Sequence, residues 1–190
     1  METTASSSNT GFLFLAVIEP SVREKIGAGM VERPIHTVLL VDDNPDDCEM
    51  VREAWKEMPI GEHLRMVSDG ADLLDYLYRR GVYGNRESAP RPSVILLDLN
   101  MPCMTGEEVL EELNKDQVLS CIPVVVLTTS KAPRDIFQTA TLGVNGYMQK
   151  PPTYSGYLQM FANVRDHWAE ILSCSMLRGG EDWGGQPAWQ

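Results

Sequence analysis

Positively charged residues are scarce in this chain. Its 190 residues include 16 lysines and arginines but 27 aspartates and glutamates, which gives a net charge of −11. This balance argues against a protein that coats nucleic acid, because phosphate binding needs clustered cations. Long apolar runs are lacking too: the longest early one, from Phe12 to Ile18, is far shorter than the roughly 18 residues of a membrane-spanning helix. We therefore expect neither direct DNA binding nor a membrane span.

The sequence also lacks paired cysteines and clustered histidines. Its four cysteines (Cys48, Cys103, Cys121 and Cys174) show no C-x-x-C spacing, which predicts reduced thiols in a cytoplasmic protein. Its three histidines are scattered, which argues against a zinc site. The start has Glu2 in place of a cationic segment and no evident small-residue cleavage site, so we expect no secretory signal.

Composition divides the chain into one domain with two tails. Residues 35–172 hold the periodic apolar segments and are predicted to be the folded domain. Residues 1–34 are Ser-, Thr- and Gly-rich and are expected to form a flexible N-terminal extension. A native start at Met30 and a genuine tail are both open readings. Residues 173–190 are turn-rich and are expected to be a disordered C-terminal tail.

Short apolar runs alternate with helical patterns inside this domain. Three continuous, β-branched runs predict strands that are buried on both faces of a parallel sheet, and two weaker runs predict strands nearer the edges. These runs cover residues 38–41, 94–97 and 124–127, then 64–67 and 147–149.

Helix signals follow each predicted strand. Asn44 is a candidate N-cap, with Asp46 and Asp47 at the positive end of the helix dipole. Thr105 and Glu108 match a capping box. Three further helices are expected to begin near residues 69, 133 and 154, the first of them ending at Gly81 and the second at Gly143. Five strands alternating with five helices predict an α/β fold with a doubly wound parallel sheet.

Polar residues stand where four of these strands end. Asp42 and Asp43 follow the first strand, Asp98 follows the third, Thr128 ends the fourth and Lys150 follows the fifth. The carboxyl ends of parallel strands share one edge of a sheet, so these residues are expected to meet there.

Three carboxylates in one crevice repel one another, and a single lysine leaves negative charge in excess. A hard divalent ion suits the remainder, and Mg²⁺ fits best because it accepts carboxylates, waters and phosphate oxygens. A metal, a lysine and a hydroxyl around one carboxylate predict a phosphoryl-transfer site.

This constellation resembles the receiver domain of two-component response regulators. The matching segments are VLLVDDNPDD, ILLDLNMP followed by TG, VVVLTTS, and GYMQKP, in this order along residues 36–172. Each segment alone is weak, but four in order after the expected strands are highly specific. The resemblance implies a flavodoxin-like sheet of five strands in the order 2-1-3-4-5, with five helices.

The resemblance also implies a role for each matching residue. Asp98 would be the phosphoacceptor. Asp43 would bind Mg²⁺ directly and Asp42 through water, while Asp98 and the backbone carbonyl of Asn100 would complete the protein ligands.

The remaining matches concern the phosphoryl group and the switch. Thr128 would hydrogen-bond the phosphoryl oxygen and Lys150 would pair with it. The Lys150–Pro151 bond is commonly cis in this family, which would aim the lysine inward. Tyr147 would be the aromatic residue whose rotamer couples to the movement of Thr128.

The long connection from Gly81 to Pro92, the TTSK segment and Trp168 resemble the stand-alone regulators that are paired with phytochrome-type histidine kinases. The resemblance implies a single-domain response regulator in a phosphorelay, and not an enzyme. Such a regulator would accept a phosphoryl group from a histidine kinase and respond by changing its protein contacts. That subfamily often forms homodimers through the fourth helix, fifth strand and fifth helix.

The alternative in the enzyme class is a haloacid dehalogenase-like phosphatase, which also uses an aspartyl phosphate and Mg²⁺. That family needs a D-x-D pair, whereas Asn100 stands two residues after Asp98. A flavodoxin-type cofactor binder is disfavoured because no Gly-rich phosphate loop follows the first strand.

Overall fold

The protein is described by a computed structural model that covers residues 12–13, 37–57, 63–85, 87–129 and 142–166. A six-stranded sheet runs through its centre in the order β1-β6-β5-β4-β2-β3. The strands are β1 (Phe12–Leu13), β2 (Thr37–Val41), β3 (His63–Val67), β4 (Val94–Asp98), β5 (Val124–Thr128) and β6 (Gly146–Gln149). The helices among these residues are α2 (Pro45–Glu57), α3 (Gly70–Leu77), α4 (Gly106–Lys115) and α6 (Tyr154–Asp166), with short 3₁₀ turns at Gly81–Tyr83 and Leu119–Cys121.

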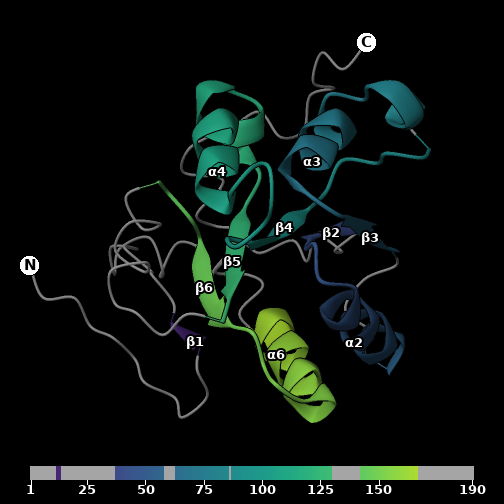
Figure 1. Ribbon diagram of the computed structural model, residues 1–190, viewed down its shortest axis with the longest axis vertical. Coiled ribbons are helices and arrows are strands. Elements are labelled where there is room, and N and C mark those ends of the chain that lie inside the picture. Colours follow the sequence, from purple (N-terminus) through teal and green to yellow (C-terminus); the bar gives the residue numbers. More distant parts are fainter. Residues whose placement is uncertain (1–11, 14–36, 58–62, 86, 130–141, 167–190) are drawn as a thin grey trace, which may run out of the picture.

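Five of the strands are parallel and confirm the predicted topology. Strands β2 to β6 lie in the spatial order β3-β2-β4-β5-β6, which is 2-1-3-4-5 in their order along the chain. Helices α3 and α4 cover one face of the sheet, and α2 and α6 cover the other (Figure 1). The fold is therefore the doubly wound, flavodoxin-like one.

Each face of the sheet carries its own apolar core. All residues of β2, β4 and β5 are buried, as continuous apolar strands between two helical layers must be. Leu39 and Val41 point toward α3 and α4, whereas Val38 and Leu40 point toward α2 and α6. This alternation follows from the two-residue period of a strand and leaves the strand ends for polar groups.

The predicted caps of two helices are confirmed. The side chain of Asn44 accepts hydrogen bonds from the backbone N–H groups of Asp46 (2.9 Å) and Asp47 (3.4 Å) and so begins α2. Thr105 and Glu108 form the full capping box at the start of α4. Helix α2 therefore begins just after the acidic end of β2, whereas the loop of residues 99–105 separates α4 from the end of β4.

The end of α3 differs from the prediction that Gly81 stops it. The helix ends at Leu77, and Arg79 takes the left-handed backbone conformation that usually favours glycine (φ 53°). The N–H of Arg79 bonds to Tyr76 O at 3.2 Å, and that of Arg80 bonds to Asp75 O at 2.8 Å. These two bonds form a Schellman motif, which satisfies the last helical carbonyls before the chain reaches Gly81.

Strand β1 is an element that the sequence did not predict. It lies within the expected flexible extension, yet Phe12 pairs with Met148 and Leu13 with Tyr147 in antiparallel register. Two residues carry no recognisable strand pattern, so only the open edge of β6 specifies this pairing.

Other predictions fall on parts of the chain outside the described residues. The helix expected from about residue 133 lies there, as do the end of the last helix with Trp168 and most of both tails. Within the described ranges, no helix is long and apolar enough to cross a membrane.

Candidate functional site

The carboxyl edge of the sheet gathers the predicted residues. Asp42 directly follows β2, Asp98 ends β4, Thr128 ends β5 and Lys150 directly follows β6. These four residues are between 0% and 7% exposed. Backbone bonds fix the neighbouring strand ends, because Lys150 N–H donates to the carbonyl of Thr128 at 2.8 Å. The arrangement brings together groups that lie far apart in the sequence, as predicted.

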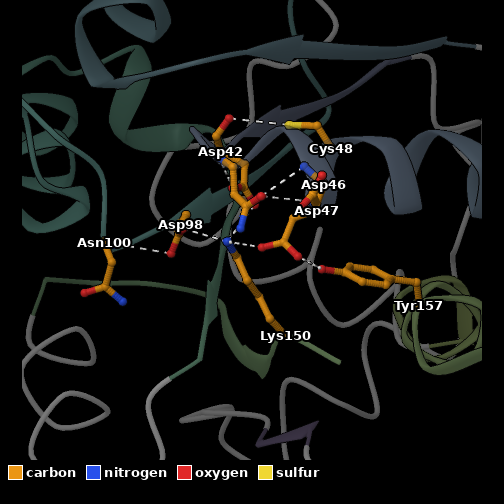
Figure 2. Close-up of polar contacts among 9 residues, drawn as sticks. Asp42, Asp46, Asp47, Cys48, Asp98, Asn100, Lys150 and Tyr157 are labelled. Atoms are coloured by element: carbon orange, nitrogen blue, oxygen red, sulfur yellow. Dashed lines mark hydrogen bonds and ion pairs between the residues drawn. The ribbon is translucent and has the colours of Figure 1, made fainter. Parts of the chain in front are cut away.

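Lys150 lies at the centre of this site. Its Nζ is 2.7 Å from Asp42 Oδ2 and 2.6 Å from Asp98 Oδ2 (Figure 2). Burial alone lowers the pKa of Lys150, but hydrogen bonds to Asp42 and Asp98 outweigh it and raise the pKa above its usual value. The lysine is therefore a permanent cation between two buried carboxylates.

The lysine reaches this position without the expected cis bond. The described residues contain no cis peptide bond, so Lys150–Pro151 is trans. The prediction of a cis bond was wrong. The Lys150 side chain still points inward, where its ammonium pairs with the buried carboxylates of Asp42 and Asp98.

Three carboxylates form an oxygen-rich cluster beside the lysine. Oxygens of Asp42, Asp43 and Asp98 lie within 4.8 Å of one another, and Asp43 is the exposed member. Burial is the main cause that raises the pKa of Asp42; Lys150 opposes this shift and the nearby charge of Asp98 adds a smaller upward contribution. One lysine does not balance three acids, and the hard oxygen donors fit Mg²⁺.

Asn100 lies next to this cluster. Its backbone N–H donates to Asp98 Oδ1 at 3.2 Å, and its side chain is exposed. Likewise, the N–H of Asn44 donates to Asp42 Oδ1 at 3.0 Å. These two bonds orient the carboxylates at the ends of β2 and β4.

Tyr147 and Thr128 lie on the neighbouring strands β6 and β5. Tyr147 pairs with Val126 of β5, two residues before Thr128. Its side chain is 3% exposed and lies in the core under α3 and α4. The structure thus places the expected switch tyrosine inward.

Gly106 allows α4 to approach the site closely. A Cβ atom at this position would lie 2.6 Å from Asp98 O and 2.7 Å from Leu99 Cα. Both are backbone atoms that cannot move aside cheaply. Gly106 is the glycine of the TG pair in the matching segments, but only the structure shows how closely it approaches the backbone of Asp98.

Asp47 is a member of the site that the sequence did not assign. Its Oδ2 is 3.1 Å from Lys150 Nζ, and its Oδ1 accepts a hydrogen bond of 3.1 Å from Tyr157 OH. The sequence assigned Asp47 only to the positive end of the helix dipole. One signal in the sequence could have pointed to this contact, because a tyrosine that is buried needs a hydrogen-bond partner for its hydroxyl. Burial and the nearby Asp47 raise the pKa of Tyr157, so its hydroxyl stays protonated and donates.

Comparison with known proteins agrees with this geometry. The family model of the response regulator receiver domain matches residues 38–161, which contain every predicted site residue. The chain belongs to the response regulator receiver family. Receiver domains are signalling proteins, and phosphorylation and Mg²⁺ binding are typical of them. The phosphatase alternative has no support in this match.

Relatives of this receiver chain include regulators that are named for phytochromes or red light. The chain is 36% identical over 140 residues to the response regulator Rcp1 of Synechocystis sp., and the match covers 74% of this chain and 93% of Rcp1. The solved structure of the phosphorylated cyanobacterial phytochrome response regulator RcpA is 38% identical. It matches with a TM-score of 0.64 over 70% of this chain and 94% of RcpA. The regulator RPA3017 in red light signaling of R. palustris is 34% identical, with a TM-score of 0.66 and the same two coverages.

Proposed function

We propose that Asp98 accepts a phosphoryl group from the phosphohistidine of a histidine kinase. A carboxylate oxygen of Asp98 attacks the phosphorus, a new O–P bond forms, and the N–P bond to the imidazole breaks. The electron pair of that bond stays on the imidazole nitrogen, which regains its lone pair. The observation that carries the proposal is the 2.6 Å contact between Asp98 and the buried Lys150 ammonium, because this cation can neutralise the incoming anion.

Four residues would hold the divalent ion. Asp43, Asp98 and the backbone carbonyl of Asn100 are the proposed direct ligands, and Asp42 the ligand through water. A bound Mg²⁺ would offset the negative charge of the phosphoryl oxygens. Support comes from the three carboxylates that converge within 4.8 Å and from the Mn²⁺-bound structure of Rcp1, which is 37% identical to this chain.

Three further residues would read the phosphorylated state. Lys150 pairs with a phosphoryl oxygen, Thr128 hydrogen-bonds another, and Tyr147 follows the movement of Thr128 by changing its rotamer. The buried position of Tyr147 two residues from the level of Thr128 supports this coupling.

We further propose a phytochrome-type histidine kinase as the partner, because Rcp1, RcpA and RPA3017 resemble this chain and the last two are named for phytochrome or red light. A homodimer would use the helix expected at 133–143 together with β6 and α6. A cytoplasmic location fits the free thiols of Cys48, Cys103 and Cys121.

The test is labelling by acetyl phosphate in the presence of Mg²⁺. The wild type should be labelled and Asp98→Asn should not. Asp75→Asn is the matched control, since Asp75 has an exposed side chain on α3 and should leave labelling unchanged. Label that survives Asp98→Asn would refute Asp98 as the acceptor.

Two further assays test the class of protein and its partner. Sustained multiple turnover of a chromogenic phosphate ester would contradict a signalling switch. Phosphotransfer from a panel of phosphorylated histidine kinases should be fastest from a phytochrome-type kinase, and preference for another kinase class would overturn that assignment.

A further inference from the structure

Asp47 contacts the central cation of the site but has no part in the chemistry above. We propose that Asp47 is a positioning residue that holds the Lys150 ammonium beside Asp98, and that Tyr157 fixes Asp47 in turn. This inference rests on the proposed function of Asp98, and the test below separates the two.

The first argument is the number of donors and acceptors. An ammonium group has three N–H donors, and Lys150 finds three carboxylates at 2.7, 2.6 and 3.1 Å. Asp42 and Asp98 are at the sheet edge, whereas Asp47 comes from the first turn of α2. Lys150 is 7% exposed, so water cannot easily replace the third acceptor.

The second argument is the direction of the contacts. Figure 2 shows Asp98 and Asp47 on opposite sides of the Lys150 ammonium. When a phosphoryl group is attached to Asp98, Lys150 must exchange a carboxylate contact for a phosphoryl oxygen. The Asp47 contact does not take part in that exchange and keeps the flexible side chain in place.

Tyr157 extends this set of contacts to α6. It is 1% exposed, and its hydroxyl donates to the Asp47 oxygen that does not face Lys150. Both oxygens of Asp47 therefore have partners, one on the lysine and one on α6. The rotamer of Asp47 is fixed from the side of the molecule where α2 and α6 lie together (Figure 1).

Three variants separate contact from charge. Asp47→Asn removes the carboxylate but keeps the shape, and Tyr157→Phe keeps every charge but removes the hydroxyl. The control is Asp46→Asn, because Asp46 carries the same charge on the same helical turn. It is exposed, and it is not among the ion-pair partners of Lys150 in the described structure.

The first measurement is hydrogen exchange of the Lys150 ammonium by NMR, in protein labelled with ¹⁵N-lysine and free of phosphodonor. The resonance is assigned by its loss in Lys150→Met. Wild type and Asp46→Asn should exchange slowly. Asp47→Asn should exchange about tenfold faster, because an amide is uncharged and has one acceptor oxygen for the two donors, Lys150 and Tyr157, that the two Asp47 oxygens serve. Tyr157→Phe should change in the same direction.

The second measurement is the rate of labelling by acetyl phosphate. Asp47→Asn should lower the maximal rate by about tenfold, because a displaced lysine no longer meets the incoming phosphoryl group, with little change in the half-saturating concentration. Asp46→Asn should match the wild type.

Equal ammonium exchange in Asp47→Asn and Asp46→Asn would overturn the proposal, and so would a wild-type exchange rate in Tyr157→Phe. The exchange measurement needs no phosphorylation. A failure of Asp98 to be labelled would therefore overturn the proposed function and leave this result standing.

Discussion

Replacing Lys150 by methionine removes the positive charge from the centre of the site while keeping a side chain of similar length. The acidic residues around the lysine then face one another without a cation. Asp42 and Asp98 are 2% and 4% exposed, so solvent screens their charges weakly. We predict a large loss of folding stability in the absence of Mg²⁺.

The structure sets the size of this loss. Two unit charges 4.8 Å apart, the limit within which the carboxylate oxygens lie, repel by about 3.5 kcal/mol at an effective dielectric constant of about 20. A carboxylate can avoid this repulsion by taking up a proton, at a cost of about 4 kcal/mol at pH 7. Both routes predict a loss of roughly 3–5 kcal/mol, the range seen when a buried ion pair loses one partner.

The assay is urea unfolding followed by circular dichroism at pH 7, with and without Mg²⁺. Lys115→Met is the control, because the Lys115 side chain is 65% exposed and should change stability by less than about 0.5 kcal/mol. Mg²⁺ at about a hundredfold excess over its dissociation constant adds about 2.7 kcal/mol to a folded state that binds it. It should narrow the gap between Lys150→Met and the wild type, since it replaces the missing cation.

The same Lys150→Met substitution in the Asp98→Asn variant tests whether the loss of stability comes from charge repulsion. In Asp98→Asn protein one of the facing charges is already gone, so Lys150→Met should cost less there by about 2–3 kcal/mol. If Lys150→Met is as stable as the wild type without Mg²⁺, or costs the same in both backgrounds, the lysine does not neutralise this cluster.

Three other perturbations test separate parts of the account. Asp43→Ala should weaken Mg²⁺ binding at least about tenfold by calorimetry, because it removes a proposed direct ligand. Gly106→Ala should cost about 1–3 kcal/mol and slow the labelling of Asp98, because the new methyl group meets the Asp98 carbonyl at 2.6 Å. Tyr76 donates a hydrogen bond to Pro90 O at 2.8 Å and burial raises its pKa to about 12. Because the folded-state pKa lies above the ordinary value, the protonated Tyr76 phenol stabilises the fold fully below pH 10, and this stabilisation is lost as pH rises through 12. Tyr76→Phe should lessen the loss of folding stability at alkaline pH by about 2–3 kcal/mol.

Each of these expectations has a contrary outcome. Unchanged Mg²⁺ affinity in Asp43→Ala would remove Asp43 as a ligand. If Gly106→Ala had the stability and the labelling rate of the wild type, the close approach of Gly106 to the Asp98 carbonyl would matter for neither. An equal change of stability between pH 9 and pH 12 in the wild type and in Tyr76→Phe would mean that folding does not raise the pKa of this phenol.

The sequence predicted those parts of the site that depend on strand order. Apolar runs define β2, β4 and β5, and parallel pairing brings their carboxyl ends together. Asp42, Asp98, Thr128 and Lys150 could therefore be placed at one edge before any coordinates were known. The caps at Asn44 and Thr105 were predictable for a similar reason, because a cap depends on residues only two or three positions away.

Features that depend on side-chain direction or distant pairing could not be predicted. Asp46 and Asp47 are equivalent as charges at a helix start, and only the position of α2 against β6 decides that Asp47 reaches the lysine. The pairing of β1 with β6 depends on an open sheet edge far along the chain. The left-handed residue that follows α3 is Arg79 and not the usual glycine, so Gly81 was a reasonable but incorrect stop.

The most direct test of the central claim is to locate the phosphoryl group chemically. Protein treated with acetyl phosphate and Mg²⁺ is reduced with borohydride, which converts an aspartyl phosphate to homoserine, and the peptides are sequenced by mass spectrometry. The account predicts homoserine at position 98 in the treated wild type and unmodified aspartate there without Mg²⁺. Homoserine at another aspartate, with Asp98 unchanged, would contradict it.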